Sequence, residues 1–251
     1  MSNNSNSNSN SSSSNNNRYK YKYKVVKLMY KMMMMLGNDD PEVVNKDKSS
    51  TDNIPKLIEV SQKPRIYRIP KFLTDEECEH LIETSKNKLK PCNEISSGVH
   101  RSGWGLFMKE GEEDHPVTQN IFNRMKTFVN LTESSEVMQV IRYNPGEETS
   151  AHFDYFNPLT TNGAMKIGLY GQRICTILMY LADVEEGGET SFPEVNVKVK
   201  PIKGDAVLFY NCKPNGEVDP LSLHQGDPVI KGTKWIAIKL VNQKNTGSSA
   251  P

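Results

Sequence analysis

From residue 54 onward, the chain has two parts that differ in the spacing of their hydrophobic residues. In its first part, apolar residues recur every three or four positions, which is the spacing of one face of an α-helix. One such segment begins at Thr74, which forms a capping box with Glu77, and runs to about Leu89. A second begins at Pro116, a residue tolerated in the first helical turn, and continues to Val129. The pattern predicts two helices that pack on one side of a sheet.

From Glu136 onward the period is that of β-strands. Runs rich in β-branched and aromatic residues alternate with turn clusters such as Asn144-Pro145-Gly146. The predicted strands are residues 137–143, 173–181, 195–199, 206–210 and 234–241. Several strands at short spacing favour a sandwich or barrel over a parallel α/β sheet. We therefore expect an α+β fold in which supporting helices come first and a double-sheet β structure follows.

The N-terminal region has a different composition. Residues 1–17 are almost wholly Ser and Asn, which cannot bury enough apolar area to offset the entropy of ordering the chain. Basic residues then accumulate before the first acidic residue, Asp39, although the net charge of the whole chain is only +1. We predict a disordered basic tail over 1–53, one domain over 54–245 and a short tail over 246–251. A basic tail alone is weak evidence for nucleic-acid binding, and we expect no nucleic-acid partner.

The apolar segment 25–37, which includes Met32 to Met35, raises the question of targeting. Lys27 and Lys31 interrupt it, and it is shorter than the roughly 20 apolar residues of a transmembrane helix. No small-residue cleavage site follows it, as a signal peptide would require. An organelle presequence or an uncleaved anchor stays open as an alternative. We expect a cytoplasmic protein without stable membrane insertion.

His152 and Asp154 are the first candidates for chemistry. On a strand, residues two apart point to the same face, and an imidazole beside a carboxylate supplies two ligands of the triad that holds non-haem iron. Of the five histidines, His224 alone lies downstream in the strand-rich half. Ten residues later, Lys234 starts a strand whose alternation would direct its cation inward, where a dicarboxylate cosubstrate would supply the counter-charge. The alternatives are a surface pair or a satisfied polar contact for His152 and Asp154, and an end-of-strand surface lysine for Lys234.

Six segments follow one another in the second half of the chain: QVIRYNPGEE (139–148), HFDYF (152–156), RICTILMYLAD (173–183), EGGETSFPE (186–194), KGDAVLFYN (203–211) and LHQGDPVIKGTKW (223–235). In these segments and in their order, the chain resembles the catalytic domain of the prolyl 4-hydroxylase family. Weaker similarity extends back through HRSGWGL (100–106) to the helix at Thr74, so the resemblance covers about the last two hundred residues.

The resemblance implies a jelly-roll core, also called a double-stranded β-helix, and a set of site residues. His152, Asp154 and His224 would hold iron(II). The implied cosubstrate contacts are Lys234, Tyr143, Tyr180 and Thr190. For the two tyrosines, the alternative is that they only pack in the hydrophobic core. Arg101 and Ser102 occupy positions that contact the peptide in related enzymes.

The implied reaction is hydroxylation of a peptidyl proline at its 4-position, coupled to oxidation of 2-oxoglutarate to succinate by molecular oxygen. The cofactors would be Fe²⁺, 2-oxoglutarate and L-ascorbate, the partner a proline-containing protein, and no catalytic residue beyond the metal ligands is needed. Thr149 and Leu240 stand where the family has aromatic residues, so substrate preference would differ. The alternatives are a related dioxygenase acting on another residue or on a small molecule, and an inactive jelly-roll homologue.

Overall fold

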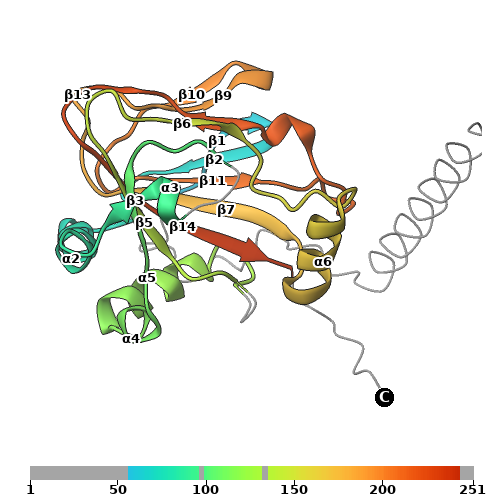
Figure 1. Cartoon of the computed structure of the whole chain (residues 1–251), viewed down its shortest axis with the longest axis horizontal. Helices are drawn as coiled ribbons and strands as arrows, with labels where there is room; N and C mark the ends of the chain where they lie inside the picture. Colours follow the sequence, from blue (N-terminus) through green and yellow to red (C-terminus); the bar gives the residue numbers. More distant parts are fainter. Residues whose placement is uncertain (1–55, 96–98, 132–134, 244–251) are drawn as a thin grey trace, which may run out of the picture.

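The computed structural model describes residues 56–95, 99–131 and 135–243, which form three layers (Figure 1). A small sheet lies over a large sheet, and helices cover the other face of the large sheet. The predicted tail, Met32 to Met35 and both predicted domain boundaries lie outside the described residues. The helices are α2 (Asp75–Ser85), α3 (Cys92–Ile95), α4 (Glu110–Glu113), α5 (Pro116–Met125) and α6 (Thr161–Tyr170), with 3-10 turns η2 (Pro193–Val195) and η3 (Pro220–Ser222).

The large sheet has the strand order β1-β2-β11-β7-β14-β5-β4-β3, and all its neighbouring strands are antiparallel. Its strands are β1 (Ile58–Gln62), β2 (Arg65–Ile69), β3 (Lys90–Pro91), β4 (Trp104–Phe107), β5 (Gln139–Tyr143), β7 (Arg173–Tyr180), β11 (Ala206–Tyr210) and β14 (Lys234–Asn242). The predictions for β5, β7, β11 and β14 are confirmed to within two residues at each end.

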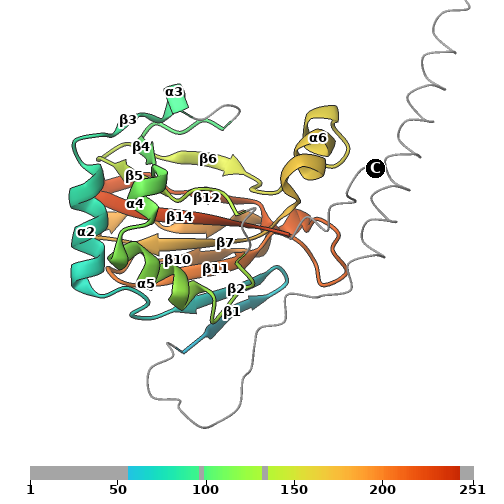
Figure 2. The same ribbon diagram turned by 90° about the horizontal axis from the view of Figure 1, so that it is seen from below.

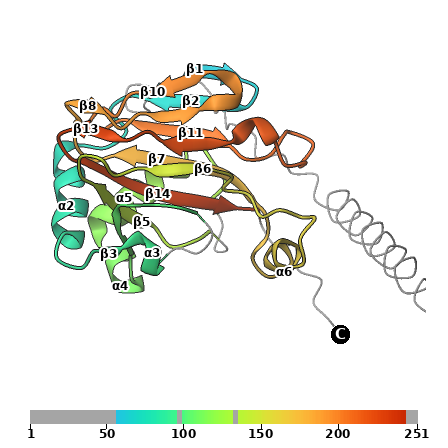
Figure 3. The ribbon, with the colours of Figure 1, turned by 45° about the horizontal axis from the view of Figure 1, so that its top comes forward.

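The small sheet has the order β10-β9-β12-β6, and a separate two-stranded ribbon pairs β13 with β8. These strands are β6 (Thr149–His152), β8 (Glu186–Gly187), β9 (Thr190–Phe192), β10 (Val197–Val199), β12 (His224–Gly226) and β13 (Val229–Lys231). Two facing antiparallel sheets are the double-sheet arrangement predicted from the sequence. Figure 3 shows the ribbon at the end of the molecule near α2 and α6 at the opposite end.

The central strand β7 is buried on both faces because it lies between the helices and the small sheet. Ile177 and Met179 pack in the cluster that includes the helices, whereas Leu178 and Tyr180 pack between the two sheets. Side chains alternate across a strand, so each face of β7 contributes to a different core. Complete burial of such a side chain stabilises the fold by about 1.5–3 kcal/mol.

The two predicted helices exist and cover the large sheet, as Figure 2 shows. Thr74 caps α2 in the predicted capping box, and Pro116 occupies the first turn of α5. Both helices are shorter than predicted. The α2 helix ends at Ser85 instead of about Leu89, because the exposed polar residues 86–88 follow Ser85. The α5 helix ends at Met125 instead of Val129.

The predicted order, helices before strands, is wrong. The β1–β2 hairpin precedes α2, and β3 and β4 lie in the chain between α2 and α5. On one side strand β2 pairs with β1, and on the other side it pairs with β11, whose Ala206 lies opposite Ile69. Because that partner lies far away in the sequence, the local pattern did not reveal the strand.

Helix α6 was not predicted. It carries two glycines and buries only Gly163 and Ile167, while Met165 and Leu169 are more than half exposed. Thr160 caps it by accepting a hydrogen bond from the Gly163 amide. Within the described ranges, no helix is long and apolar enough to cross a membrane.

Candidate active site

His152 and His224 are brought together by the pairing of β6 with β12. His152 is the last residue of β6, His224 is the first of β12, and the two are direct partners in the antiparallel register. Directly opposed residues have Cβ atoms about 4.5–5.5 Å apart, close enough for both side chains to reach one point. Their ring centroids are 4.4 Å apart.

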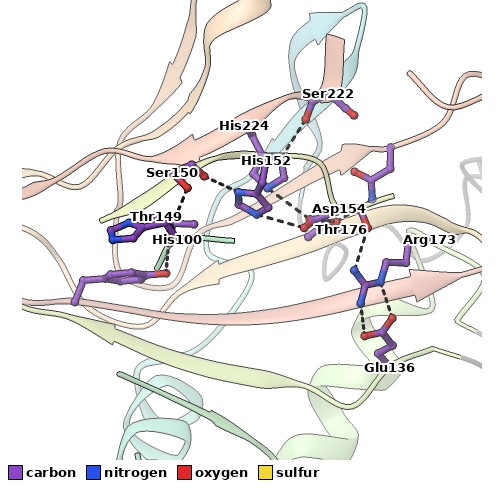
Figure 4. Close-up of polar contacts among 12 residues, drawn as sticks. His100, Glu136, Thr149, Ser150, His152, Asp154, Arg173, Thr176, Ser222 and His224 are labelled. Atoms are coloured by element: carbon purple, nitrogen blue, oxygen red, sulfur yellow. Dashed lines mark hydrogen bonds and ion pairs between the residues drawn. The ribbon is translucent and has the colours of Figure 1, made fainter. Parts of the chain in front are cut away.

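Asp154 lies two residues beyond the end of β6, so its orientation depends on β7 (Figure 4). The Thr176 hydroxyl donates to Asp154 Oδ2 over 2.7 Å, and Arg173 Nη1 donates to the Asp154 carbonyl oxygen over 3.1 Å. Asp154 Oδ1 lies 3.5 Å from His152 Nε2, and Oδ2 lies 3.5 Å from His224 Nε2. Together these contacts aim the carboxylate at the two imidazoles.

Backbone carbonyls fix the tautomer of both histidines. His152 Nδ1 lies 2.8 Å from the Ser150 carbonyl oxygen, and His224 Nδ1 lies 3.0 Å from the Ser222 carbonyl oxygen. A carbonyl only accepts, so each Nδ1 carries the proton and donates it. In the neutral imidazole this arrangement leaves Nε2 with a lone pair, the form in which imidazole binds a metal ion.

The three side chains fit a metal ion. One donor atom from each of His152, Asp154 and His224 lies within 4.8 Å of the others. Burial lowers the pKa of His224 to about 4, which keeps its imidazole neutral. Burial acts to raise the pKa of Asp154, but His224, His152 and Thr176 outweigh it and hold that pKa well below its ordinary value. An ionised carboxylate and neutral imidazoles are the ligand forms that the iron triad of non-haem oxygenases requires.

Lys234 is a buried cation that faces the same cavity. It is 2% exposed, and among the described residues it forms no ion pair. Burial lowers its pKa to about 8, and Asp227 and Glu189 offset this only through space. Asp227 is already engaged by Lys198 and by the Ser191 hydroxyl. A buried charge without a partner is costly, so this ammonium fits the carboxylate of a ligand.

One open cavity connects the metal candidates with Lys234, with about 400 Å³ of empty space when the part open to solvent is included. Among the residues expected from the sequence, the cavity is lined by His152, Asp154, His224, Lys234, Tyr143, Thr190 and Arg101. Apolar side chains of the large sheet complete the wall, namely Leu178, Phe209, Ile236 and Ile238. Apolar walls exclude water and strengthen polar interactions inside the cavity.

Two expected contacts lie beside the cavity instead of in its lining. Tyr180 is fully buried between the sheets, and its hydroxyl donates to Thr190 Oγ1 over 2.8 Å, so it supports a cavity residue from behind. Ser102 accepts a hydrogen bond from the Glu148 amide over 2.7 Å and joins two loops at the surface. Thr149, which stands where the family has an aromatic residue, lines the cavity and shares a 2.7 Å hydrogen bond with the Tyr143 hydroxyl.

Sequence reasoning missed the residues that hold the Asp154 segment. Gln172 is fully buried and pairs with the backbone of Phe156, accepting from its amide and donating to its carbonyl oxygen, both over 2.8 Å. Arg173 forms a two-pronged ion pair with Glu136 (Figure 4). The only available signal was the presence of polar residues at the start of an otherwise apolar strand.

The comparison with known proteins agrees with this geometry. The sequence model of the 2OG-Fe(II) oxygenase superfamily matches residues 138–242. Probable prolyl 4-hydroxylase 4 of Arabidopsis thaliana is 36% identical over 219 residues, which cover 76% of this chain and 71% of that protein. Prolyl 4-hydroxylase 2 of the same plant is 36% identical over 223 residues, covering 77% and 72%. The chain belongs to the prolyl 4-hydroxylase family.

A solved structure extends the similarity to three dimensions. It is the viral collagen prolyl hydroxylase from Paramecium bursaria Chlorella virus-1 in complex with 2-oxoglutarate. Its TM-score is 0.57 at 30% identity, with 70% of this chain and 94% of that chain covered. Membership of the prolyl 4-hydroxylase family confirms the predicted jelly-roll class, the oxidoreductase activity and the dependence on iron(II) and 2-oxoglutarate.

Proposed function

We propose that this prolyl 4-hydroxylase family member hydroxylates a peptidyl proline at its 4-position, with iron(II) bound by His152, Asp154 and His224. One observation carries the assignment of the site. The three donor atoms line a single cavity with the Lys234 ammonium, which forms no ion pair with a described residue, so a metal ion and a dicarboxylate fit side by side. The relatives named prolyl 4-hydroxylases support proline as the target.

Each cavity residue has a defined task in this proposal. When bound, iron(II) and 2-oxoglutarate together reduce oxygen, yielding succinate, carbon dioxide and a hydroxyl group on the substrate carbon. Lys234 neutralises the distal carboxylate of 2-oxoglutarate, and Thr190 and Tyr143 line the space beside that ammonium. Leu178 and Ile236 keep water away from the reacting atoms. No side chain has to remove a proton from the substrate carbon.

The substrate is proposed to be a proline-containing protein that approaches past Arg101. This guanidinium lies at the cavity, and its buried Nε has no hydrogen-bond partner within the described residues. A peptide carbonyl would satisfy such a donor. A cytoplasmic location stays a prediction from the sequence, which fractionation of cells that produce the full chain would test.

The decisive experiment measures succinate formation from 2-oxoglutarate with iron(II), ascorbate and a pool of proline-containing peptides. Wild type should release succinate in a peptide-dependent manner and add sixteen daltons to proline. His152→Ala should lose both signals, because it removes one of three metal ligands. His115→Ala is the matched control, since His115 is an exposed histidine at the start of α5, outside the cavity.

The other outcomes separate the alternatives. A sixteen-dalton gain on another residue or on a small molecule would keep the oxygenase but replace the substrate. Absence of succinate from a wild-type protein with bound metal would favour the inactive jelly-roll homologue. Equal activity of His152→Ala and wild type would refute the metal site.

A further inference from the structure

Asp154 differs from its two histidine partners in how it is held. His152 and His224 lie on paired strands, whereas Asp154 lies beyond the end of β6 and has no ladder partner there. Its carboxylate is fixed by the hydroxyl of Thr176, a residue of β7 that is 1% exposed. The orientation of this candidate ligand therefore depends on one side chain of a neighbouring strand.

A second hydrogen bond determines which way the Thr176 hydroxyl points. Asn211 Nδ2 donates to Thr176 Oγ1 over 3.0 Å, and an amide nitrogen has no capacity to accept. The Thr176 proton is therefore directed to Asp154 Oδ2. Asn211 is fully buried. Its backbone amide donates to the Ile174 carbonyl oxygen, and its backbone carbonyl oxygen accepts from the Asp219 backbone amide. These backbone contacts fix the position of Asn211 beside Thr176.

We infer that Thr176, oriented by Asn211, is a positioning residue that sets the affinity of the site for its metal ion. The two hydrogen bonds form a relay from Asn211 through Thr176 to Asp154, and the relay holds the carboxylate with one oxygen 3.5 Å from each Nε2 atom. Without the hydroxyl, the carboxylate can rotate within the cavity and its Oδ2 loses a buried donor. The inference rests on the metal site of the proposed function and adds a residue that does not touch the metal.

The test compares Thr176→Val, which keeps the shape of the side chain, with Thr176→Ser, which keeps the hydroxyl. The readout is the dissociation constant for Mn²⁺, measured by titration calorimetry without 2-oxoglutarate. Loss of a hydrogen-bond partner to a metal ligand weakens binding by about 10- to 100-fold, and we expect this loss for Thr176→Val. Thr176→Ser should stay within about threefold of wild type, because its hydroxyl preserves that partner.

Asn211→Ala tests the relay independently. It should weaken Mn²⁺ binding less than Thr176→Val does, and the double variant should be no weaker than Thr176→Val alone, since residues in one network are not additive. The melting temperature of each metal-free variant separates a folding defect from a loss of affinity. Wild-type affinity in Thr176→Val, or equal losses in Thr176→Val and Thr176→Ser, would overturn the inference. Absence of Mn²⁺ binding by wild type would refute the metal site itself and the role of Thr176 with it.

Discussion

His152 and His224 face each other directly across β6 and β12, with ring centroids 4.4 Å apart. Strand β6 is the edge strand of the small sheet, where it pairs with β12. A metal ion bound to both imidazoles would join an edge strand to the interior of the sheet. Metal binding and the stability of the small sheet should therefore be coupled.

Mn²⁺ should raise the melting temperature of the protein. A ligand at about 100 times its dissociation constant adds about 2.7 kcal/mol to the free energy of unfolding. For a domain of this size that corresponds to a rise of about 5–11 °C. Differential scanning calorimetry with and without Mn²⁺ checks the shift. His224→Ala should abolish it and His115→Ala should retain it; an undiminished shift in His224→Ala would contradict the assignment.

The affinity for 2-oxoglutarate should fall as the pH rises. Burial lowers the pKa of Lys234 to about 8, and only the protonated ammonium attracts a carboxylate. Binding is thus strongest below this pKa and weakens by about tenfold for each pH unit well above it. Calorimetric titration with 2-oxoglutarate in the presence of Mn²⁺, between about pH 7 and pH 9.5, measures the profile.

Lys234→Arg is the control for that profile. A guanidinium stays charged throughout this range, so the variant should bind 2-oxoglutarate more weakly but with a flat pH dependence. A flat profile for wild type would show that Lys234 does not bind the carboxylate.

Glu136→Gln should destabilise the protein and loosen the metal site. Glu136 holds Arg173, which in turn donates to the Asp154 carbonyl oxygen. The two side chains are 26% and 22% exposed, so solvent weakens the pair and we expect a loss of about 1 kcal/mol in urea unfolding. Mn²⁺ affinity should fall by a smaller factor than in Thr176→Val. Glu83→Gln, at an exposed ion pair with Lys86, should change neither quantity.

Thr74→Ala should reduce stability without reducing turnover. The Thr74 hydroxyl oxygen accepts a hydrogen bond from the Glu77 backbone amide. The Glu77 carboxylate accepts one from the Thr74 backbone amide, which completes the capping box of α2. Loss of such a cap costs about 1 kcal/mol. Thermal unfolding checks the loss, and Thr74→Ser should preserve stability. Reduced turnover in folded Thr74→Ala would indicate that α2 affects the cavity.

The parts of the fold that the sequence predicted are those with local signals. The capping box at Thr74, the proline at the start of α5 and the apolar run of β7 each lie within a few consecutive residues. The candidate metal and cosubstrate ligands were also predictable, because a His-x-Asp pair and a lysine ten residues after His224 can be recognised in the sequence alone. Their convergence on one cavity depends on the pairing of β6 with β12, which joins the histidines, and on β7 and β14, which hold Asp154 and carry Lys234.

The remaining features depend on partners that are distant in the sequence. Strand β1 is mostly exposed, and β2 lies between β1 and the strand β11 that is distant in sequence, so neither has a strong pattern of its own. Helix α6 has two glycines and an exposed apolar face, which conceals its helical period. Thr176 lies within a buried apolar run, and its sequence separation from Asp154 has no regular spacing that would connect them.

The pairing of Gln172 with the Phe156 backbone brings the two ends of the α6 segment together. A loop whose ends are already joined can change length at little entropic expense, about 0.6 kcal/mol for each doubling. Residues 157–171 can therefore be shortened, extended or exchanged in evolution or by grafting while Asp154 keeps its place. The surface that carries α6 is therefore free to diversify while the candidate metal ligands keep their positions.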